Sequence, residues 1–588
     1  ICLLIYIMSA DFKTTLIKDA RLADITDQLT YSVQSGASSN TYQQFTAVST
    51  SSSSMTFNIQ IPSENIVVSR EVLIQTDIAF TINITGVAPA ATAFNYGATD
   101  AFQAFPLNSL FTTSSAQINN TNVSVNLQDV LPSILRLNSN RELYRYNGMT
   151  PCLPDQAYKS FANGVGASNN PLGDYADQSY DGDLIPRGAF PCTFAVVHNI
   201  AAGGADASVV STDLLDTWVI TGLVKVTEPI LGLSPFIYGD GTYNKQGLVG
   251  INAMSFVFNV DTSCKRFFST ASTATYSVSL GTAAQTNPFT NCRMLVNFLT
   301  TQPTDLISAR NIVPYMDLPR YLSLQSGTAP MVGGSTASFN SQNIQINQLP
   351  DYFIISVRKP MSSQSVKDSS TFFKVNNISI NLNNTSGLLS SAVAEDLWRI
   401  SVNNHSHQSW AEFSGAVSNA NNATGIGSPI NTPGSLLILS PAYDLSLPDY
   451  LSSGSIGQYN FQFNIGVTNN SGETITPEIC IICVNSGIFT TIAGSSNIYT
   501  GVLTKQMVLD AKTNEESVDP VSSVQYRRMV GGSMLDRIAT AAKSPLGRSL
   551  INKGLSAASS AAQRYLGSGV ASGAGVASGG SRLDRLCY

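Results

Sequence analysis

The amino-acid sequence predicts an all-β protein with two strand-rich blocks. Many short segments place an apolar side chain at every second position, as residues 54–62 (SMTFNIQIP) and 459–468 (YNFQFNIGVT) do. This period of two is typical of strands with one buried face. Turn-forming dipeptides separate the segments, and patterns typical of helices are few before residue 525. Antiparallel sandwiches or barrels are the architectures that fit these observations.

Further strands are expected throughout both blocks. They cover residues 72–84, 217–226, 254–260, 275–280, 293–300, 352–358, 435–441 and 477–484. Asn-Gly at 147–148 and Asp-Gly at 181–182 and 240–241 supply turns. Two segments have an apolar pattern that fits helices, LQDVLPSILRL at 127–137 and SAVAEDLWRI at 391–400.

The strand pattern and the changes in composition divide the chain into five parts. We expect an N-terminal arm (1–45), a first β domain (46–310), an extended link (311–323), a second β domain (324–525) and a tail (526–588). The link carries two prolines, which favour extended backbone between domains. Long loops interrupt the first domain at 147–190 and 226–250, and loops of that length usually serve a purpose.

Charge is scarce and unevenly distributed. Charged residues make up 12% of the chain, about half the usual share of roughly 25%. Because interface centres are depleted in charge, this composition favours extensive self-association. From Tyr526 onward, nine basic and two acidic residues give a net charge of +7, so the first 525 residues carry −13 of the total of −6. Two regions of opposite sign indicate two different environments.

The cysteines do not indicate a disulfide framework. They are scattered along the chain as Cys2, Cys152, Cys192, Cys264, Cys292, Cys480, Cys483 and Cys587. Cys480 and Cys483 form a CxxC inside an apolar strand, where positions i and i+3 face opposite sides. No second CxxC completes a zinc site, so we expect buried, reduced thiols. The apolar start, ICLLIYIM, is too short to span a bilayer, and Met8 fits a natural start, with residues 1–7 as an upstream stretch.

Signatures of enzymes are missing from the sequence. The chain has only three histidines, too few to favour a hydrolytic triad or a histidine metal site. His405 and His407 are expected in a polar loop. No GxSxG, P-loop or GxGxxG is present. Glu395 and Asp396 are adjacent on a predicted helix, where their side chains diverge, so we expect solvated or capping groups. We therefore expect no enzyme activity, no cofactor and no metal site.

The stretch 377–415, NISINLNNTSGLLSSAVAEDLWRISVNNHSHQSWAEFSG, with 434–469 after it, resembles the second domain of double jelly-roll major capsid proteins. The most similar groups are those of virophages and Polinton-like viruses. Residues 55–71 (MTFNIQIPSENIVVSRE) and 105–136 (FPLNSLFTTSSAQINNTNVSVNLQDVLPSILR) resemble matching segments of the first domain. The resemblance covers roughly residues 45–525 and includes phrases from both blocks in the right order.

The resemblance implies two tandem eight-stranded antiparallel jelly rolls with long loop insertions and a basic C-terminal tail. It also implies a homotrimer that forms a pseudo-hexameric capsomer of an icosahedral virion shell around double-stranded DNA. Penton and minor capsid proteins are then expected partners, and loops 147–190 and 226–250 are candidates for outward towers. Within 377–415, a strand and a short helix would start a long connection. Its anchors, by burial of apolar area, would be Leu397, Trp398, Trp410 and Phe413.

The basic tail is expected to face the capsid interior. There it could contact packaged DNA without sequence preference, a minor protein or an internal membrane. The residues expected to do so are Arg527, Arg528, Arg537, Lys543, Arg548, Lys553 and Arg564. Two alternatives remain open on sequence grounds. One is another virion component, such as a penton, spike or receptor-binding protein. The other is a β-sandwich enzyme acting on carbohydrate, which needs a carboxylate pair across a cleft.

Overall fold

The computed structural model divides the chain into two units, Ile1–Met529 and Val530–Tyr588. It describes residues 13–17, 30–34 and 38–500 of the first unit, with gaps at 86–93, 98, 139, 156–184, 186, 202–214, 237–246, 272–273, 302–309, 420–427, 446–452 and 493. The basic tail and its seven expected contact residues therefore lie outside the described residues, as do Cys2 and Cys587.

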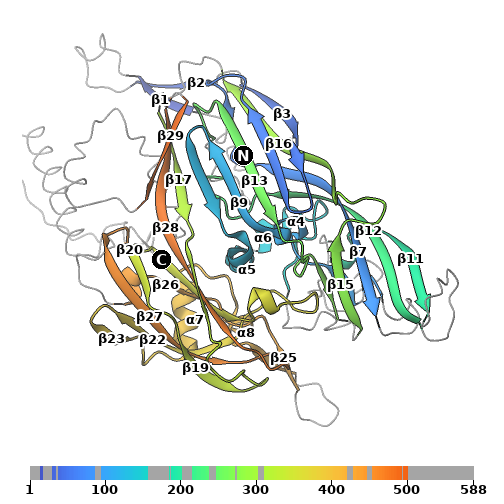
Figure 1. The fold of residues 1–588 in the computed structure, drawn as a ribbon. Helices are drawn as coiled ribbons and strands as arrows, with labels where there is room; N and C mark the ends of the chain where they lie inside the picture. Colours follow the sequence, from blue (N-terminus) through green and yellow to red (C-terminus); the bar gives the residue numbers. More distant parts are fainter. Residues whose placement is uncertain are drawn as a thin grey trace, which may run out of the picture. The chain divides into compact units, whose positions relative to one another are not determined.

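Two antiparallel sheets form the first sandwich (Figure 1). The first sheet contains, in spatial order, β10 (Thr121–Val125), β9 (Phe111–Ile118), β13 (Ala253–Val260), β5 (Ser54–Gln60) and β4 (Ser49–Thr50). The second contains β11 (Thr193–Ala201), β12 (Leu215–Pro229), β7 (Leu73–Thr85), β16 (Phe289–Thr301) and β3 (Ser38–Thr46). Two further strands extend this second sheet, β15 (Thr275–Leu280) beside β7 and β6 (Val67–Val68) beside β16.

The alternation of apolar and polar residues in the sequence explains which face of each strand is buried. In β5, Met55, Phe57 and Ile59 are fully buried, and the residues between them point away from the core. Phe57 lies opposite Phe256 of β13 in the antiparallel register. Burying a side chain of this size contributes about 2–3 kcal/mol relative to exposure, so the alternation determines which face turns inward.

A second sandwich repeats this design further along the chain. Its first sheet contains β17 (Arg310–Asp317), β28 (Glu478–Ile492), β21 (Tyr352–Arg358) and β26 (Leu437–Leu439), with β18 (Arg320–Leu324) and β29 (Ser495–Thr500) also paired to β28. Its second sheet contains β19 (Thr336–Asn340), β27 (Ile456–Thr468), β22 (Lys374–Leu382) and β23 (Thr385–Leu388), with β20 (Ile344–Gln348) also paired to β27. One apolar core, centred on residues such as Phe353, Phe461 and Phe463, fills the space between these sheets.

The two sandwiches share one strand order. The path β5–β13–β9–β10 of the first corresponds to β19 and β20–β27–β22–β23 of the second. The path β3–β16–β7–β12 corresponds to β17 and β18–β28–β21–β26. Each sandwich has eight strand positions, and the chain passes through these positions in the same order in both sandwiches. The expected fold, two tandem eight-stranded antiparallel jelly rolls, is confirmed.

Helices occupy connections between strands. Helix α5 (Leu127–Leu137) follows β10 and helix α7 (Ala394–Asn403) follows β23, so both predicted helices are confirmed at equivalent places. Shorter helical segments are α4 (Pro106–Leu110), α6 (Asn140–Tyr144), α8 (Trp410–Phe413) and α9 (Pro441–Asp444), with 3₁₀ turns at Arg187–Ala189 and Met361–Ser363.

Small two-stranded pairs complete the described parts: β1 (Lys13–Ile17) with β2 (Thr30–Gln34), β8 (Asp100–Phe102) with β14 (Phe268–Thr270), and β24 (Ala416–Asn419) with β25 (Ser428–Asn431). In the described part of the chain, no helix is long and apolar enough to cross a bilayer.

Three segments differ from the sequence-based expectation. The expected link 311–323 is extended, but β17 and β18 pair with β28 and so belong to the second sandwich. Pro314 is accommodated because β17 is an edge strand. Proline has no backbone N–H, and at the open edge of a sheet no neighbouring strand needs that donor. The end of the expected arm forms β3, which pairs with β16. The expected loop 226–250 begins later, because β12 continues to Pro229. Much of loop 147–190 and part of 226–250 lie outside the described residues.

Candidate functional site

The connection after β22 is organised around four apolar side chains. Leu397 of α7 and Phe413 of α8 are fully buried in the core of the second sandwich, and Trp398 and Trp410 are half-buried against it. The indole rings of Trp398 and Trp410 meet edge to face with centroids 5.9 Å apart, and Trp410 lies over Phe413 at 6.4 Å. The four residues expected as anchors therefore form one cluster. How much each stabilises the fold stays a prediction.

Polar side chains that the sequence interpretation missed hold the same connection. The Trp398 indole N–H donates to the Gln408 carbonyl at 3.0 Å. The Gln408 amide in turn donates to the carbonyl of Gly434 and accepts from the N–H of Leu436, both at 3.0 Å. In α7 the Ser401 hydroxyl donates to the Leu397 carbonyl and accepts from the N–H of Ile438 in β26. These bonds tie both helices to the strand that returns to the sheet.

One of the missed features has a clear sequence signal. Ser409 and Glu412, in the sequence SWAE, form a capping box at α8: the Ser409 hydroxyl accepts from the Glu412 N–H, and the Glu412 carboxylate accepts from the Ser409 N–H. Gly434, by contrast, is required by space. Its φ is +89°, and a Cβ there would lie 1.9 Å from the Phe372 carbonyl oxygen.

The polar candidates of this stretch behave as expected. His405 is in a turn with a positive φ, and His407 is exposed in the loop before α8. The Asp396 carboxylate caps α7 by accepting from the Val393 N–H at 3.4 Å. Among the described residues, no group of three or more His, Cys, Asp or Glu side chains could hold a metal ion.

A buried ionic cluster joins the two sandwiches. Asp129, at the third position of α5, bonds through one carboxylate oxygen to Arg358 of β21 at 2.5 Å and through the other to Arg320 of β18. Arg358 also donates to the Asp129 carbonyl and to the Glu478 carboxylate of β28. The Arg358 side chain is 2% exposed, so its charge depends on these acceptors in place of water.

A second ionic group extends the same junction. Asp155 pairs with Arg187 at 2.6 Å and accepts from the N–H of Ser370 in the second sandwich at 2.9 Å. Arg136, near the end of α5, donates to the Asp155 carbonyl. Arg266 bridges the sandwiches too, because it donates to the Gln128 carbonyl and to the Ser370 hydroxyl. Long-range pairings of this kind carry no local sequence signal, so sequence interpretation missed them.

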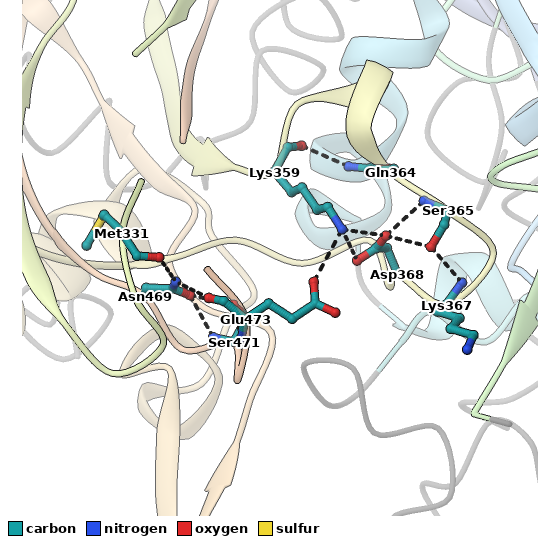
Figure 2. Close-up of polar contacts among 9 residues, drawn as sticks. All are labelled: Met331, Lys359, Gln364, Ser365, Lys367, Asp368, Asn469, Ser471 and Glu473. Atoms are coloured by element: carbon teal, nitrogen blue, oxygen red, sulfur yellow. Dashed lines mark hydrogen bonds and ion pairs between the residues drawn. The ribbon is translucent and has the colours of Figure 1, made fainter. Parts of the chain in front are cut away.

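Figure 2 shows how the loop that meets the first sandwich is held in shape. Lys359 lies between the Asp368 carboxylate, at 3.0 and 3.1 Å, and the Glu473 carboxylate, at 3.4 Å. Asp368 also accepts from the backbone and hydroxyl of Ser365. The loop then presents its carbonyls to the first sandwich: that of Asp368 accepts from the Gln103 amide, and that of Val366 accepts from the Thr270 N–H.

Burial changes the acid–base properties of several groups. Burial raises the pKa of Glu228, which is fully enclosed and accepts hydrogen bonds from Leu107, Asn108 and Thr150. Burial also raises the pKa of the Cys480 thiol to about 11, which keeps it protonated at neutral pH. Cys480 and Cys483 are both free and buried, as expected.

Comparisons with known proteins agree with this architecture. Residues 10–299 match a family model described as the Sputnik virophage major capsid protein first domain, and residues 318–487 match one described as the major capsid protein V20 C-terminal domain. A curated relative, the putative capsid protein V20 of Sputnik virophage, is 28% identical over 529 residues, covering 88% of this chain and 84% of its own.

Solved structures show the same fold. The structure of the Sputnik virophage obtained by cryo-EM matches with a TM-score of 0.68 and 25% identity, over 87% of this chain and 98% of the other. The crystal structure of the mavirus major capsid protein matches with a TM-score of 0.59 and 14% identity, over 81% and 93%. With both domains matched in order and both sandwiches present in the structure, the chain belongs to the family of virophage major capsid proteins.

Proposed function

We propose that three copies of this chain form a pseudo-hexameric capsomer, and that these capsomers tile an icosahedral virion shell around double-stranded DNA. The observation that carries this proposal is the duplication within the chain. Two sandwiches with one strand order occur in each copy, so three copies supply six equivalent building blocks. The low charge content supports burial of large surfaces between copies, and the matched Sputnik structure comes from a virion.

The proposed role is structural and involves no catalysis. In the described residues, Asp129 of the first sandwich pairs with Arg320 and Arg358 of the second, and Asp155 pairs with Arg187 within the first. This pairing supports an architectural use of ionisable side chains. The carbohydrate-enzyme and spike alternatives lose support because a second complete jelly roll follows the first.

Light scattering on purified protein tests the trimer. We expect a stable species with three times the 62.5 kDa chain mass, because obligate interfaces commonly bury roughly 2,000 Å² or more and persist on dilution. Negative-stain images should show hexagonal particles or shells. A folded monomer at micromolar concentration would contradict the proposal, and slender trimers would favour a spike.

We further propose that the basic tail faces the capsid interior, where packaged DNA, a minor capsid protein or an internal membrane could meet it. The split of +7 against −13 supports this placement. Trypsin treatment of intact and opened particles provides the test. A tail that is resistant in closed particles and cleaved after opening supports interior placement. Cleavage between Arg527 and Arg564 on closed particles would contradict it.

A further inference from the structure

One edge of the second sandwich is open along β18. Strand β18 pairs with β28 on one side, and in the described part of the chain no strand pairs with its other side. At the two ends of this ladder the Cys483 N–H donates to the Pro319 carbonyl and the Gln325 N–H donates to the Pro477 carbonyl. Since bonding alternates along an antiparallel pair, the odd-numbered residues of β18 bond to β28. The N–H and C=O groups that point away from β28 belong to Arg320, Leu322 and Leu324.

The neighbouring part of the same edge is protected. Strand β17 also pairs with β28, and there Pro314 has no N–H to offer. The Met316 N–H donates to the Ser234 hydroxyl of the first sandwich at 2.9 Å. Natural proteins commonly block open edges in these ways, with proline or with a covering segment. Strand β18 contains no proline, and its Leu324 is 49% exposed. Among the described residues, β18 is therefore free to accept one more strand.

A cavity lies beside this open edge. It measures about 200 Å³, and its lining includes Tyr321 and Ser323 of β18, Ile344 of β20 and the core residue Ile481. Sites for drug-sized molecules measure roughly 300–1,000 Å³, so this cavity is better suited to a single side chain. Tyr321 lies opposite Ile481 in the register and packs against the core. Because side chains alternate along a strand, a strand added to β18 would direct every second side chain toward this core.

The other side chains of an added strand would lie on the face of Arg320. The Arg320 Nε donates to Asp129, and in the described residues its two terminal nitrogens have no partner. Asp129 gives its second carboxylate oxygen to Arg358, so it offers Arg320 no further acceptor. The Arg320 side chain is 32% exposed and also lines the cavity. A guanidinium with free terminal nitrogens binds carboxylates in preference to other groups.

We propose that an extended peptide segment of another protein adds to β18 as a further strand, with an apolar side chain in the cavity and an acidic side chain on Arg320. In this mode of recognition, bonds to the main chain provide affinity, and pockets for alternate side chains provide specificity. The basic tail of this chain is a poor occupant, because its net charge of +7 would bring like charges to Arg320. The inference assigns a partner site to the shell protein and does not depend on the trimer.

Peptide binding to the full-length chain tests the chemistry of the site. The probe is a short fluorescein-labelled peptide of alternating valine and glutamate, and the control peptide alternates valine and lysine. We expect fluorescence anisotropy to show at least about tenfold tighter binding of the glutamate peptide, because only its carboxylates can pair with Arg320. The acidic body, with a net charge of −13, would otherwise favour the lysine peptide. Equal binding of the two peptides, or no binding of the glutamate peptide, would overturn the inference.

A pair of variants tests the strand edge without changing Arg320. Leu324→Pro removes an N–H from the open edge, where proline is tolerated. Leu324→Ala removes the same exposed side chain and keeps the N–H. We expect the proline variant to bind the glutamate peptide at least about tenfold more weakly, since a main-chain bond is lost, and the alanine variant to bind like wild type. Matching urea unfolding curves confirm that both variants are folded.

Equal affinities of the two variants would overturn the inference. Binding that appears only when trimers dissociate would also overturn it, because the edge would then be covered by a second copy. That result would leave the proposed function intact. A monomeric wild type that binds the glutamate peptide in the expected way would have the opposite meaning: it would support the site and contradict the proposed trimer.

Discussion

At the scale of single residues, Trp398 combines an apolar contact with one hydrogen bond. Its ring packs against the core of the second sandwich and against Trp410, and its N–H bonds to the Gln408 carbonyl. Truncating a buried aromatic residue costs roughly 3–5 kcal/mol, and Trp398 is half-buried, so we expect Trp398→Ala to cost about 2–3 kcal/mol. Trp398→Phe should lower the free energy of unfolding by only about 1 kcal/mol. Phenylalanine keeps an aromatic ring in the core but loses the hydrogen bond from the indole N–H to the Gln408 carbonyl. Urea unfolding measures both.

The same reasoning applies to Trp410, which lies between Trp398 and Phe413. We expect Trp410→Ala to lower the yield of soluble trimer together with the free energy of unfolding. Wild-type unfolding curves in both alanine variants would show that the cluster does not anchor the connection.

Glu228 provides a prediction on pH. Burial raises its pKa above the ordinary 4.5, so the folded chain favours the protonated form more than the unfolded chain does. The stabilisation linked to this proton is complete below about pH 4.5 and is lost as pH rises through the folded-state pKa. We expect Glu228→Gln to become more stable relative to wild type as pH rises from about 5 to about 8. Glu64→Gln, at an exposed acid, is the control. Urea midpoints whose difference stays constant with pH would refute the assignment.

At the scale of elements, α5 joins the two sandwiches through Asp129. Removing one partner of a buried ion pair leaves the other charge uncompensated, which costs roughly 3–5 kcal/mol. We therefore expect Asp129→Asn to lower the free energy of unfolding by about 3 kcal/mol, since Arg320 and Arg358 would both lose a charged acceptor. The matched control is Glu71→Gln in the more exposed pair with Arg145, where the cost should stay below about 1 kcal/mol. Equal losses in the two variants would contradict a role for the junction.

The elements differ in how far the sequence predicts them. Helix α5 is predicted at its observed bounds because an apolar pattern of helical period begins where the β-type alternation of β10 ends. Residues 311–323 are expected as a link because their two prolines favour extended backbone between domains, whereas the structure forms the strands β17 and β18 there. The capping box of Ser409 and Glu412 has a local signal in the sequence, SWAE, although helix α8 was not predicted from it. Arg358 and Asp129 are 229 positions apart, and only the tertiary fold brings them together.

At the scale of the whole molecule, duplication and charge distribution point to one mode of use. The chain contains two jelly rolls. The first jelly roll covers one sheet of the second, whereas the equivalent sheet of the first jelly roll keeps exposed outward residues. This arrangement supports the proposal that the chain acts as part of an assembly. Low charge in the body suits surfaces that become buried, whereas the basic tail suits a polyanion or an acidic surface.

This division of charge predicts that assembly and DNA contact can be separated. A chain ending at residue 525 should still form trimers, because all described strands of both sandwiches precede that position. Its binding to duplex DNA should be weaker and less dependent on salt. Each basic residue that neutralises a phosphate adds roughly 0.9 to the slope of log affinity against log salt concentration.

A full-length variant with Gln at Arg527, Arg528, Arg537, Lys543, Arg548, Lys553 and Arg564 separates charge from chain length. We expect it to behave like the shortened chain in DNA binding and like wild type in light scattering. Fluorescence anisotropy with a short duplex, repeated across a salt series, gives the slopes. If the neutralised tail kept the wild-type slope, the phosphate contacts would have to come from the acidic body. The charge split of +7 against −13 makes that an unfavourable arrangement, so such a result would reject the tail as the DNA-facing segment.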